Sequence, residues 1–310
     1  INSTNITNKN FTWNTSITLS HNKNSVKKLT GEDVQLWEAN FGYSQNTHII
    51  GVNQPLGQMY GYVTDGLYQV SDFDYDAATK TYTLKDGVPY AGEKGNVKPG
   101  MWKFKNIDGS KDNKITEADK TVIGNAYPKI YGGINNTFTY KDFDLSIFLT
   151  YSIGNDVFNA TKLTNTKTAL QNKNVLAVAD SKHRWVLVNK AGDLITDPQE
   201  MADINKGKTV AAIYDNEAGD TYIHSWAVED GSFLKLSNIT LGYTFPKKMI
   251  RKVGLSKLRL YATGSNLLTW TKYSGFDPEV STMGNGLTPG VDFGAYPRSR
   301  SFVFGINLAF

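Results

Sequence analysis

The end of the chain alternates between bulky apolar residues and small or polar ones. In the segment 301–310 the odd-numbered positions hold Val303, Gly305, Asn307 and Ala309, and the even-numbered positions hold Phe302, Phe304, Ile306, Leu308 and Phe310. A period of two predicts a β-strand. The bulky face carries three aromatic rings, whereas the opposite face offers little to fill a core. We therefore predict that the bulky face contacts lipid.

The same alternation recurs along the chain. In 143–153, Phe143, Leu145 and Ile147 share one face with further apolar residues, and only Phe148 interrupts the polar face. Counting all such segments, we expect about eight strands of the length used by membrane β-barrels. The clearest are 11–20, 56–70, 130–140, 143–153, 232–245, 257–268 and 301–310.

The connections between these segments alternate in length. Lys141 and Asp142 make a tight hairpin, and 246–254 is another short connection, whereas 71–128, 155–230 and 272–297 are long. Helical spacing in 161–180 predicts short helices inside the second long connection. Short turns at one rim and long loops at the other are typical of outer-membrane barrels, whose long loops face outside. The predicted fold class is therefore all-β, an antiparallel transmembrane β-barrel segment with long extracellular loops.

Composition narrows the class of protein. The 310 residues are 40% hydrophobic and 12% aromatic, which suits an ordered structure. The net charge of +4 is spread along the chain, which argues against a nucleic-acid partner. The chain has no cysteine, so it lacks disulfides and thiolate chemistry. The opening INSTNITNKN has no signal-peptide features, so we expect an exported form to begin further upstream.

The segment 108–119, DGSKDNKITEAD, has the spacing of a calcium loop. Such a loop needs oxygen ligands at positions 1, 3, 5 and 9, a backbone carbonyl at 7, an apolar anchor at 8 and a carboxylate at 12. Ile115 would be the anchor. The predicted calcium ligands are Asp108, Ser110, Asp112, Lys114 through its carbonyl, Thr116 and Asp119.

Three departures from the calcium pattern predict modest affinity. Position 6 is Asn113 where glycine is usual, although asparagine enters the left-handed region more easily than most residues. Position 12 is aspartate, which is shorter than glutamate, and Lys111 and Lys114 dilute the negative charge. The alternative is a surface loop without metal. Since no second loop pairs with this one, calcium would act as a structural fastener for a long external loop and not as a sensor.

Motifs for enzymatic chemistry are missing from the sequence. The four histidines, His21, His48, His183 and His224, lie far apart and form no metal-binding pair. No nucleophile elbow occurs. We therefore predict that the protein is not an enzyme. Several aromatic residues could stack on sugar rings, with an interfacial girdle or loop packing as the alternative. They are Tyr60, Tyr62, Tyr68, Trp102, Tyr127, Trp185 and Trp226.

Several stretches together resemble one family over nearly the whole chain. They include GQMYGYVTDGLYQ, IDGSKDNKITEADKTVIGNAYPKIYGGINNTFTYKDFDLSIFLTYSIGNDVFNAT, SFLKLSNITLGYTFP, LRLYATGSNLLTWTKYSGFDPEVS and YPRSRSFVFGINLAF. The chain resembles the C-terminal portion of a SusC/RagA-type TonB-dependent outer-membrane transporter of Bacteroidota. The terminal Phe310 is similar to the assembly signal at the end of such barrels.

This resemblance implies a location and partners. It implies the bacterial outer membrane with its lipid bilayer, and a barrel of about 22 strands closed by a plug. It also implies a SusD-like surface lipoprotein as a lid, and import of an oligosaccharide or peptide substrate powered by the TonB complex. Residues 1–310 would form one part of that barrel. The remaining N-terminal barrel, the plug and the TonB contact are missing from this sequence.

Two other functions stay open at the level of sequence. About eight strands can close by themselves, so a small outer-membrane barrel acting as an adhesin or anchor is one alternative. A soluble β module for carbohydrate, stabilised by calcium, is the other. The length of the native protein and its need for detergent distinguish these alternatives from a transporter segment.

Overall fold

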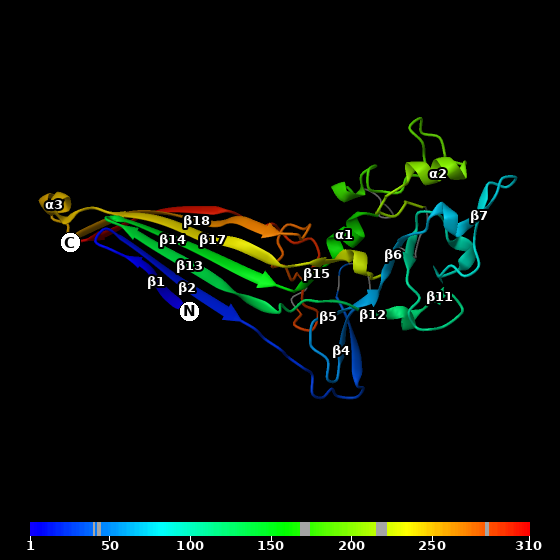
Figure 1. Ribbon diagram of the computed structural model, residues 1–310, viewed down its shortest axis with the longest axis horizontal. Helices are drawn as coiled ribbons and strands as arrows, with labels where there is room; N and C mark the ends of the chain where they lie inside the picture. The colour runs from blue at the N-terminus through cyan, green and yellow to red at the C-terminus, as the bar shows by residue number, and fades with distance from the viewer. Residues whose placement is uncertain (40, 42–44, 168–173, 215–221, 283–284) are drawn as a thin grey trace.

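A long antiparallel sheet carries a cluster of small sheets and helices at one end (Figure 1). The computed structural model describes residues 1–39, 41, 45–167, 174–214, 222–282 and 285–310. Seven strands form the long sheet in the order β1-β2-β13-β14-β17-β18-β20. Their bounds are β1 (Asn2–Thr7), β2 (Phe11–Ser20), β13 (Ile130–Tyr140), β14 (Phe143–Ile153), β17 (Phe233–Thr244), β18 (Lys257–Thr271) and β20 (Ser301–Ala309).

The other strands pair in sheets of two to four strands. They are β3 (Val34–Glu38), β4 (Asn46–Gly51), β5 (Gln58–Tyr62), β6 (Thr64–Leu67), β7 (Phe73–Asp76), β8 (Thr81–Leu84), β9 (Tyr90–Ala91), β10 (Trp102–Phe104), β11 (Lys114–Ile115), β12 (Lys120–Asn125), β15 (Asp156–Asn159), β16 (Val228–Asp230) and β19 (Val291–Asp292).

The helices are short. The α-helices are α1 (Ala160–Asn165), α2 (Pro198–Ile204) and α3 (Lys247–Ile250), and the 3₁₀ helices are η1 (Val70–Asp72), η2 (Lys94–Asn96), η3 (Glu117–Asp119), η4 (Ala177–Ala179), η6 (Ser225–Ala227) and η7 (Arg251–Val253). Within the described ranges, no helix has the length and apolarity to cross a membrane. The helices α1 and η4 confirm the helical spacing in 161–180, of which 168–173 lie outside the described residues.

The connections of the long sheet differ at its two ends, as the sequence predicted. One end has the turns 8–10, 141–142 and 245–256, the last containing α3 and η7. The other end has three long loops, which we call the first (21–129), second (154–232) and third (272–300) long loops. All three gather at the same end of the sheet in Figure 1. The predicted asymmetry is confirmed, with a first loop that starts 50 residues earlier than expected, at 21 in place of 71.

One predicted strand of the long sheet is wrong. Residues 56–70 form β5 and β6 of the first long loop, where β5 pairs with β4 and β12, and β6 pairs with β10. Both strands are shorter than the nine to eleven residues that cross a bilayer. Met59, Tyr62 and Leu67 are buried at 1%, 3% and 4% exposure. Their apolar side chains thus belong to the core of a loop, which alternation alone does not distinguish from a lipid-facing surface.

The long sheet therefore has seven strands in place of about eight. It gains β1, which the sequence did not predict because NSTNIT offers only one apolar residue, Ile6. Strand β1 pairs along β2 from Asn2↔Ser16 to Thr7↔Thr12. Strands β1 and β20 are the two edges of the sheet.

Register places most of the large apolar residues of the long sheet on one side, which we call the apolar face, whereas Phe148 and Phe233 lie on the other side. Phe304 lies opposite Ala262, which lies opposite Leu241, and Leu241 lies opposite Leu145. On β20 the bulky residues are exposed rather than packed in a core: Phe302 66%, Phe304 80%, Ile306 64% and Leu308 53%. A face of this kind matches the lipid-contacting surface predicted from the alternation.

An aromatic row crosses the apolar face near the short turns. Phe11 pairs with Tyr140, Tyr140 with Phe143, and Phe143 with Tyr243. The rings of Phe143 and Tyr243 lie 4.6 Å apart between centroids. Aromatic rows of this kind border the apolar band of membrane barrels, where amphipathic rings lie at the level of the headgroups.

The apolar face has a polar interruption on β2 and β13. Trp13 Nε1 and Thr15 Oγ1 both donate to Asn136 Oδ1, at 3.0 and 2.7 Å. Asn5 Nδ2 of β1 donates in turn to Thr15 Oγ1 at 2.7 Å. These polar groups thus satisfy one another, which lowers the cost of placing them among apolar side chains.

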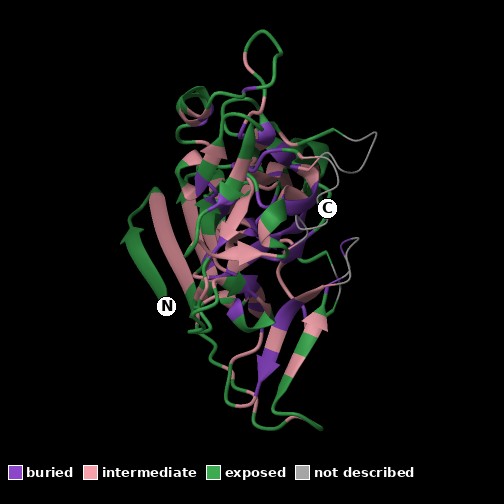
Figure 2. Cartoon of the chain, turned by 90° about the vertical axis from the view of Figure 1, so that its right-hand side faces the viewer, coloured by how far each residue is buried: buried purple, intermediate pink, exposed green. Residues whose placement is uncertain are grey.

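The hydrophobic core lies in the loops and is shared by all three of them. Phe41 and Met59 of the first long loop, Phe158 and Ile223 of the second, and Val291 of the third belong to one buried cluster. Figure 2 shows the buried positions concentrated among the loop strands, while the N-terminal edge of the long sheet is intermediate or exposed. The three long loops therefore fold as one body on top of the sheet.

Candidate functional site

The second side of the long sheet, which we call the polar face, is lined mainly by hydroxyl and amide side chains. Several of them bond to one another across strands: Ser146 Oγ to Asn135 Oδ1 at 3.1 Å, Thr240 Oγ1 with Thr263 Oγ1 at 2.9 Å, and Ser265 Oγ to Asn238 Oδ1 at 2.8 Å. The face holds Thr12, Asn14, Ser16, Thr18, Asn135, Thr137, Thr139, Ser146, Thr150, Ser152, Asn238, Thr240, Thr263 and Ser265.

Two of the charged side chains on the polar face form a direct ion pair. Arg259 of β18 donates through Nε to Asp144 Oδ1 of β14 at 3.0 Å and through its second nitrogen to Oδ2 at 2.5 Å. The two residues reach each other across β17 because Gly242 lies between them, where a Cβ would come within 2.4 Å of the guanidinium. A bidentate pair of this kind is among the stronger surface ion pairs.

A second ion-pair cluster fixes the third long loop to the sheet. Lys235 of β17 has a side chain that is only 4% exposed, and its Nζ lies 2.6 Å from Glu279 Oε2 and 3.6 Å from Asp277 Oδ2. Arg298, at the far end of the same loop, contacts both carboxylates at 2.9 and 3.1 Å. The two carboxylates therefore link Lys235 of the long sheet to Arg298, and they attach both ends of the third long loop to β17.

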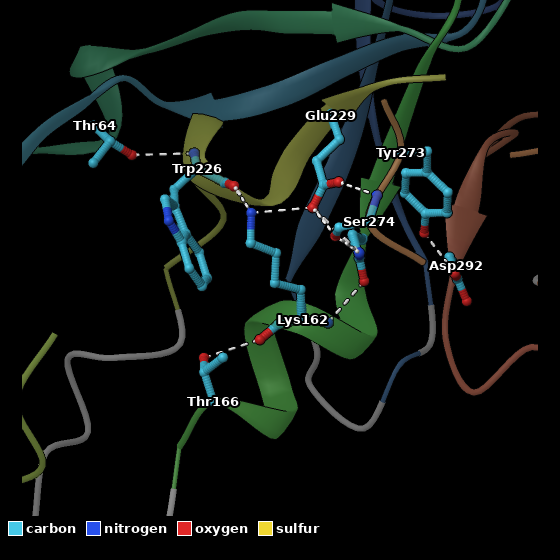
Figure 3. Close-up of polar contacts among 9 residues, drawn as sticks. Thr64, Lys162, Thr166, Trp226, Glu229, Tyr273, Ser274 and Asp292 are labelled. Atoms are coloured by element: carbon cyan, nitrogen blue, oxygen red, sulfur yellow. Dashed lines mark hydrogen bonds and ion pairs between the residues drawn. The ribbon is translucent and has the colours of Figure 1, made fainter. Parts of the chain in front are cut away.

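A polar network joins the second and third long loops (Figure 3). Lys162 of α1 lies 3.0 Å from Glu229 Oε1, and its Nζ also donates to the carbonyl of Trp226. Glu229 accepts from the backbone N–H and the hydroxyl of Ser274, each at 2.8 Å. Burial alone would raise the pKa of Glu229, but the bonds from Ser274 and the charge of Lys162 outweigh it and hold the pKa below its ordinary value.

Two buried histidines tie the first long loop to the other two. His224 of the second loop shares a 2.8 Å hydrogen bond with Thr64, and His48 Nε2 donates to the carbonyl of Pro289 in the third loop at 2.9 Å. Burial lowers the pKa of His224 to about 3, helped by the charges of Lys167 and Lys162, and lowers that of His48 to about 4. Both rings are therefore neutral at physiological pH. They contribute to packing and do not form a metal site together.

The predicted calcium loop folds as a tight turn. The N–H of Ser110 donates to Asp108 Oδ1 at 2.7 Å, and the N–H of Lys114 donates to Asp112 Oδ1 at 3.0 Å. Asn113 has a φ of +57°, the left-handed conformation that position 6 requires. Ile115 is buried and pairs with Ala91 of β9, where a calcium-binding hand would pair with a second loop.

Two of the predicted calcium ligands, Thr116 and Asp119, make other hydrogen bonds in this structure. Asp119 is fully buried, and its carboxylate accepts from the N–H groups of Ile107, Asp108 and Thr116 at 2.7, 3.2 and 2.8 Å. The Thr116 hydroxyl accepts from Ala118 N–H and caps η3. Among the described residues, no three His, Cys, Asp or Glu side chains are grouped closely enough to hold a metal. Three of the predicted ligands, Asp108, Ser110 and Asp112, therefore lie together in one turn and bond to one another, while the Asp119 carboxylate bonds to the backbone of the same segment.

Most of the aromatic residues considered for sugar stacking belong to the loop core. Tyr62, Tyr68 and Trp185 are 3%, 2% and 1% exposed, and Trp102 packs at 4.8 Å from the ring of Trp226. Tyr127 is 40% exposed. Sequence analysis missed the partners of Lys235 and Glu229. A charged residue within an otherwise uncharged strand, such as Lys235 in FLKLSNITLGYT, indicates that an ion-pair partner exists. The sequence does not show which distant carboxylate is that partner.

Comparison with known proteins gives relatives along the entire chain. No protein-family model matches. The chain is 32% identical to "TonB-dependent receptor P3" of Formosa agariphila in an alignment of 317 positions that covers 100% of this chain and 28% of the relative. It is 27% identical to "TonB-dependent receptor SusC" of Bacteroides thetaiotaomicron in an alignment of 314 positions that covers 100% of this chain and 26% of the relative.

Solved structures agree in fold. The "RagAB peptide transporter" superposes with a TM-score of 0.65 at 20% identity, over 100% of this chain and 28% of that one. The chain thus spans about a quarter of the length of the relatives that it matches. The predicted resemblance and the predicted fold class are confirmed. Because these curated relatives are named as receptors, the prediction that the chain is not an enzyme is confirmed as well.

Proposed function

Because this chain has the sequence and fold of a segment of the SusC/RagA-type TonB-dependent receptors, we propose that it forms part of an outer-membrane importer of oligosaccharides or peptides. The observation that carries this proposal is the two-sided long sheet, with exposed apolar side chains on one face and hydroxyl and amide groups on the other. In a membrane barrel, the apolar face contacts lipid and the polar face lines the lumen.

The two edges of the sheet support a larger barrel. Strands β1 and β20 each have one neighbour, so their outer N–H and C=O groups lack partners within the sheet. Lipid offers such groups no partners, and barrels solve the problem by closing. We therefore propose that further strands of the same transporter pair with β1 and β20, to a total of about 22, around a plug that contacts the TonB complex.

The three long loops support an external partner. They lie at one end of the sheet and form a single body with its own core. A rigid rim is suited to a stable contact with another protein. We propose that this rim meets a SusD-like surface lipoprotein, which acts as a lid over the lumen.

Substrate uptake by the bacterium and the composition of the complex extracted with detergent test the proposal. Deleting the gene in the native bacterium is expected to abolish uptake of one class of oligosaccharide or peptide, and the full-length gene on a plasmid should restore it. Detergent extracts are expected to yield a complex that contains the transporter and a lipoprotein, identified by mass spectrometry. Recovery of the intact protein in the aqueous fraction without detergent would contradict the proposal.

We further propose that calcium fixes the turn 108–119 in the first long loop. Calcium prefers carboxylate, hydroxyl and carbonyl oxygens, which Asp108, Ser110, Asp112 and Lys114 provide. The purified transporter is expected to melt at a higher temperature with 1–10 mM calcium (on the order of the weaker extracellular sites) than with a chelator. The double substitution of Asp108 and Asp112 by Asn should remove this difference, whereas Asp86→Asn, a fully exposed acid outside the turn, should leave it unchanged. An unchanged difference in the double variant would refute the site.

A further inference from the structure

The turn 245–256 concentrates positive charge at the short-turn end of the long sheet. In Figure 1 this turn, which contains α3 and η7, lies at the end of the sheet opposite the loop body. Five of the twelve positions in 246–257 are basic and none is acidic, so this segment alone exceeds the net charge of +4 of the whole chain. The basic residues are Lys247, Lys248, Arg251, Lys252 and Lys257.

The basic side chains of the turn have no anionic partner among the described residues. Lys247, Lys248, Arg251 and Lys252 are all exposed. The ion pairs of the described residues include none of the four. By contrast, Lys235 on the neighbouring strand β17 is paired with carboxylates. Like charges held close together repel one another, and an anionic partner relieves that repulsion.

The turn is folded and fixed to the sheet. Its buried anchor is Ile250, at 3% exposure, whose carbonyl accepts from the N–H of Leu255 at 3.2 Å. The N–H of Ser256 donates to the carbonyl of Ala309 in β20 at 2.8 Å. Gly254 ends η7 with a φ of +75°, which glycine adopts without strain. Because the backbone already has this shape, a ligand of the basic groups does not have to order the segment.

Two exposed apolar side chains lie among the charges. Met249 and Val253 are 60% and 70% exposed. They are four positions apart in the consecutive helices α3 and η7, so they share a face, and Lys248 and Lys252 have the same spacing beside them. Apolar side chains bordered by cations are typical of segments that lie in a membrane interface, where the apolar groups reach the acyl chains and the cations meet phosphates.

The position of the turn relative to the aromatic row agrees with an interface. Strand β17 reaches this row at Tyr243, and Phe245 of the turn packs against Tyr243 at 4.9 Å between ring centroids. In the neighbouring turn, Lys141 Nζ lies 5.4 Å from the ring centroid of Tyr140, which also belongs to the row. The aromatic row marks the border of the hydrocarbon, and headgroups extend roughly 5–8 Å beyond it. The basic turn therefore begins at the level of the headgroups.

We propose that the turn 245–256 binds anionic phospholipids in the periplasmic leaflet of the outer membrane. The phosphate-binding side chains are Lys247, Lys248, Arg251 and Lys252, and the side chains that reach the acyl chains are Met249 and Val253. The proposal rests on the proposed function, because the short turns face the periplasm only if the sheet belongs to a membrane barrel. A cell-wall polymer also carries anionic groups, but it offers no acyl layer to the apolar pair.

Lipid binding to the full-length transporter, purified in detergent with its co-purifying chains, tests the charges. Native mass spectrometry counts bound phosphatidylglycerol and bound phosphatidylcholine with the same acyl chains. Phosphatidylglycerol is expected to bind more tightly. A four-charge variant is expected to weaken it at least about tenfold, because each basic group near an anionic surface adds to the attraction. This variant combines Lys247→Gln, Lys248→Gln, Arg251→Gln and Lys252→Gln.

The matched control removes four exposed lysines of the long loops, through Lys27→Gln, Lys28→Gln, Lys182→Gln and Lys190→Gln. It should bind phosphatidylglycerol as the wild type does, although its net charge changes equally. Heat-modifiable mobility on a gel checks that each variant is assembled. Equal weakening in the control and in the four-charge variant would overturn the proposal.

The depth of the turn is measured without removing any charge. Val253→Cys, in a full-length transporter freed of other cysteines, carries a fluorescent label in nanodiscs of phosphatidylcholine and phosphatidylglycerol. Lipids with a nitroxide at the headgroup are expected to quench this label. The control is Val188→Cys, an apolar position of the second long loop with 45% exposure, which should not be quenched. An unquenched label at position 253, or equal quenching at both positions, would overturn the proposal.

The outcome is separate from that of the proposed function. If the transporter is recovered without detergent and does not enter nanodiscs, the importer itself is wrong. If cells import the substrate and the four-charge variant binds phosphatidylglycerol as the wild type does, the importer stands and the lipid site is overturned. A four-charge variant that loses sedimentation with purified peptidoglycan, while its lipid binding is unchanged, would replace the lipid by the cell wall as the partner of the turn.

Discussion

At the scale of single residues, buried charges and neutral histidines determine how firmly the loops are held. The side chain of Lys235 is almost completely shielded from water, and its ammonium group is paired with two carboxylates. Removing one partner from such a cluster costs more than the pair itself contributes, because the remaining charges stay partly buried.

Lys235→Met is therefore expected to loosen the third long loop by about 2 kcal/mol, below the usual cost of a fully buried pair because Glu279 remains partly exposed. Cleavage of 272–300 by added protease should become at least tenfold faster, since a factor of ten corresponds to about 1.4 kcal/mol. Arg298→Met is the control, because Arg298 contacts the same carboxylates but is 51% exposed. Similar cleavage rates for the two variants would show that burial of Lys235 has no special effect.

Acid is expected to loosen the loop body through its histidines. In the folded protein the pKa of His224 is about 3 and that of His48 is about 4, while the unfolded value is about 6.5. Between these values the unfolded state binds more protons, so the free energy of unfolding falls as the pH falls below about 6.5. At pH 5 each histidine accounts for a loss of roughly 2 kcal/mol.

Hydrogen exchange at pH 7 and pH 5, corrected for the intrinsic rate, measures this effect at 222–230. His224→Gln should reduce the pH dependence, because glutamine does not titrate. If the variant and the wild type lose protection equally on acidification, another group is responsible for the acid sensitivity.

At the scale of elements, close approach between strands depends on particular glycines. A Cβ at Gly132 would lie 2.1 Å from the carbonyl oxygen of Thr18, a backbone atom of the neighbouring strand β2. A Cβ at Gly242 would meet the ends of the Arg259 and Asp144 side chains, which can rotate. An alanine at Gly132 would therefore clash with a backbone atom that is fixed in the sheet, whereas an alanine at Gly242 would clash with side chains that can move.

Gly132→Ala is expected to impair pairing of β2 with β13 and to reduce the assembled fraction of the transporter severalfold. Gly242→Ala should assemble normally and only displace the ion pair. The fraction that shows heat-modifiable mobility in outer membranes measures assembly. Equal assembly of both variants would show that the β2 backbone yields readily at Thr18.

The elements also show where sequence analysis succeeded and where it failed. Strands β13, β14, β17, β18 and β20 were predictable because each is long and alternates over most of its length. Strand β1 was not, because a polar edge strand is identified only through its neighbour β2. The segment 56–70 alternates as well, but its residues pack in a core, and burial depends on partners far away in the sequence.

The candidate site was predictable to a smaller extent. The turn at 108–119 was found because its ligands are adjacent in sequence, including the left-handed Asn113. The sequence does not indicate that the Asp119 carboxylate accepts hydrogen bonds from three backbone N–H groups. A cavity beneath the third long loop joins Tyr131, Asn155 and Glu279, which are separated by up to about 150 positions, so it exists only in the folded chain.

At the scale of the whole molecule, the asymmetry of the connections predicts an orientation in the membrane. Long loops face outside in barrels of this kind, and short turns face the periplasm. The chain contains no cysteine, so a single cysteine introduced into it reports which side is accessible once any cysteine elsewhere in the full-length protein has been replaced. Lys190 is exposed in the second long loop, and Lys9 is exposed in the turn between β1 and β2.

Lys190→Cys in the full-length transporter should react with a membrane-impermeant maleimide on intact cells. Lys9→Cys should react only after the cells are lysed, because the outer membrane separates it from the reagent. Labelling of Lys9→Cys on intact cells, with Lys190→Cys protected, would reverse the orientation and place the loop body in the periplasm.

The shared core and the Lys162–Glu229–Ser274 network have a consequence for engineering. Grafting a single external segment from a related receptor, in order to change what is imported, would leave Glu229 or Phe158 facing foreign neighbours. Chimeras should tolerate exchange of all three segments as a set much better than exchange of any one. Natural diversification of the rim is accordingly expected to proceed by coordinated replacement, with the seven strands below kept as a constant base.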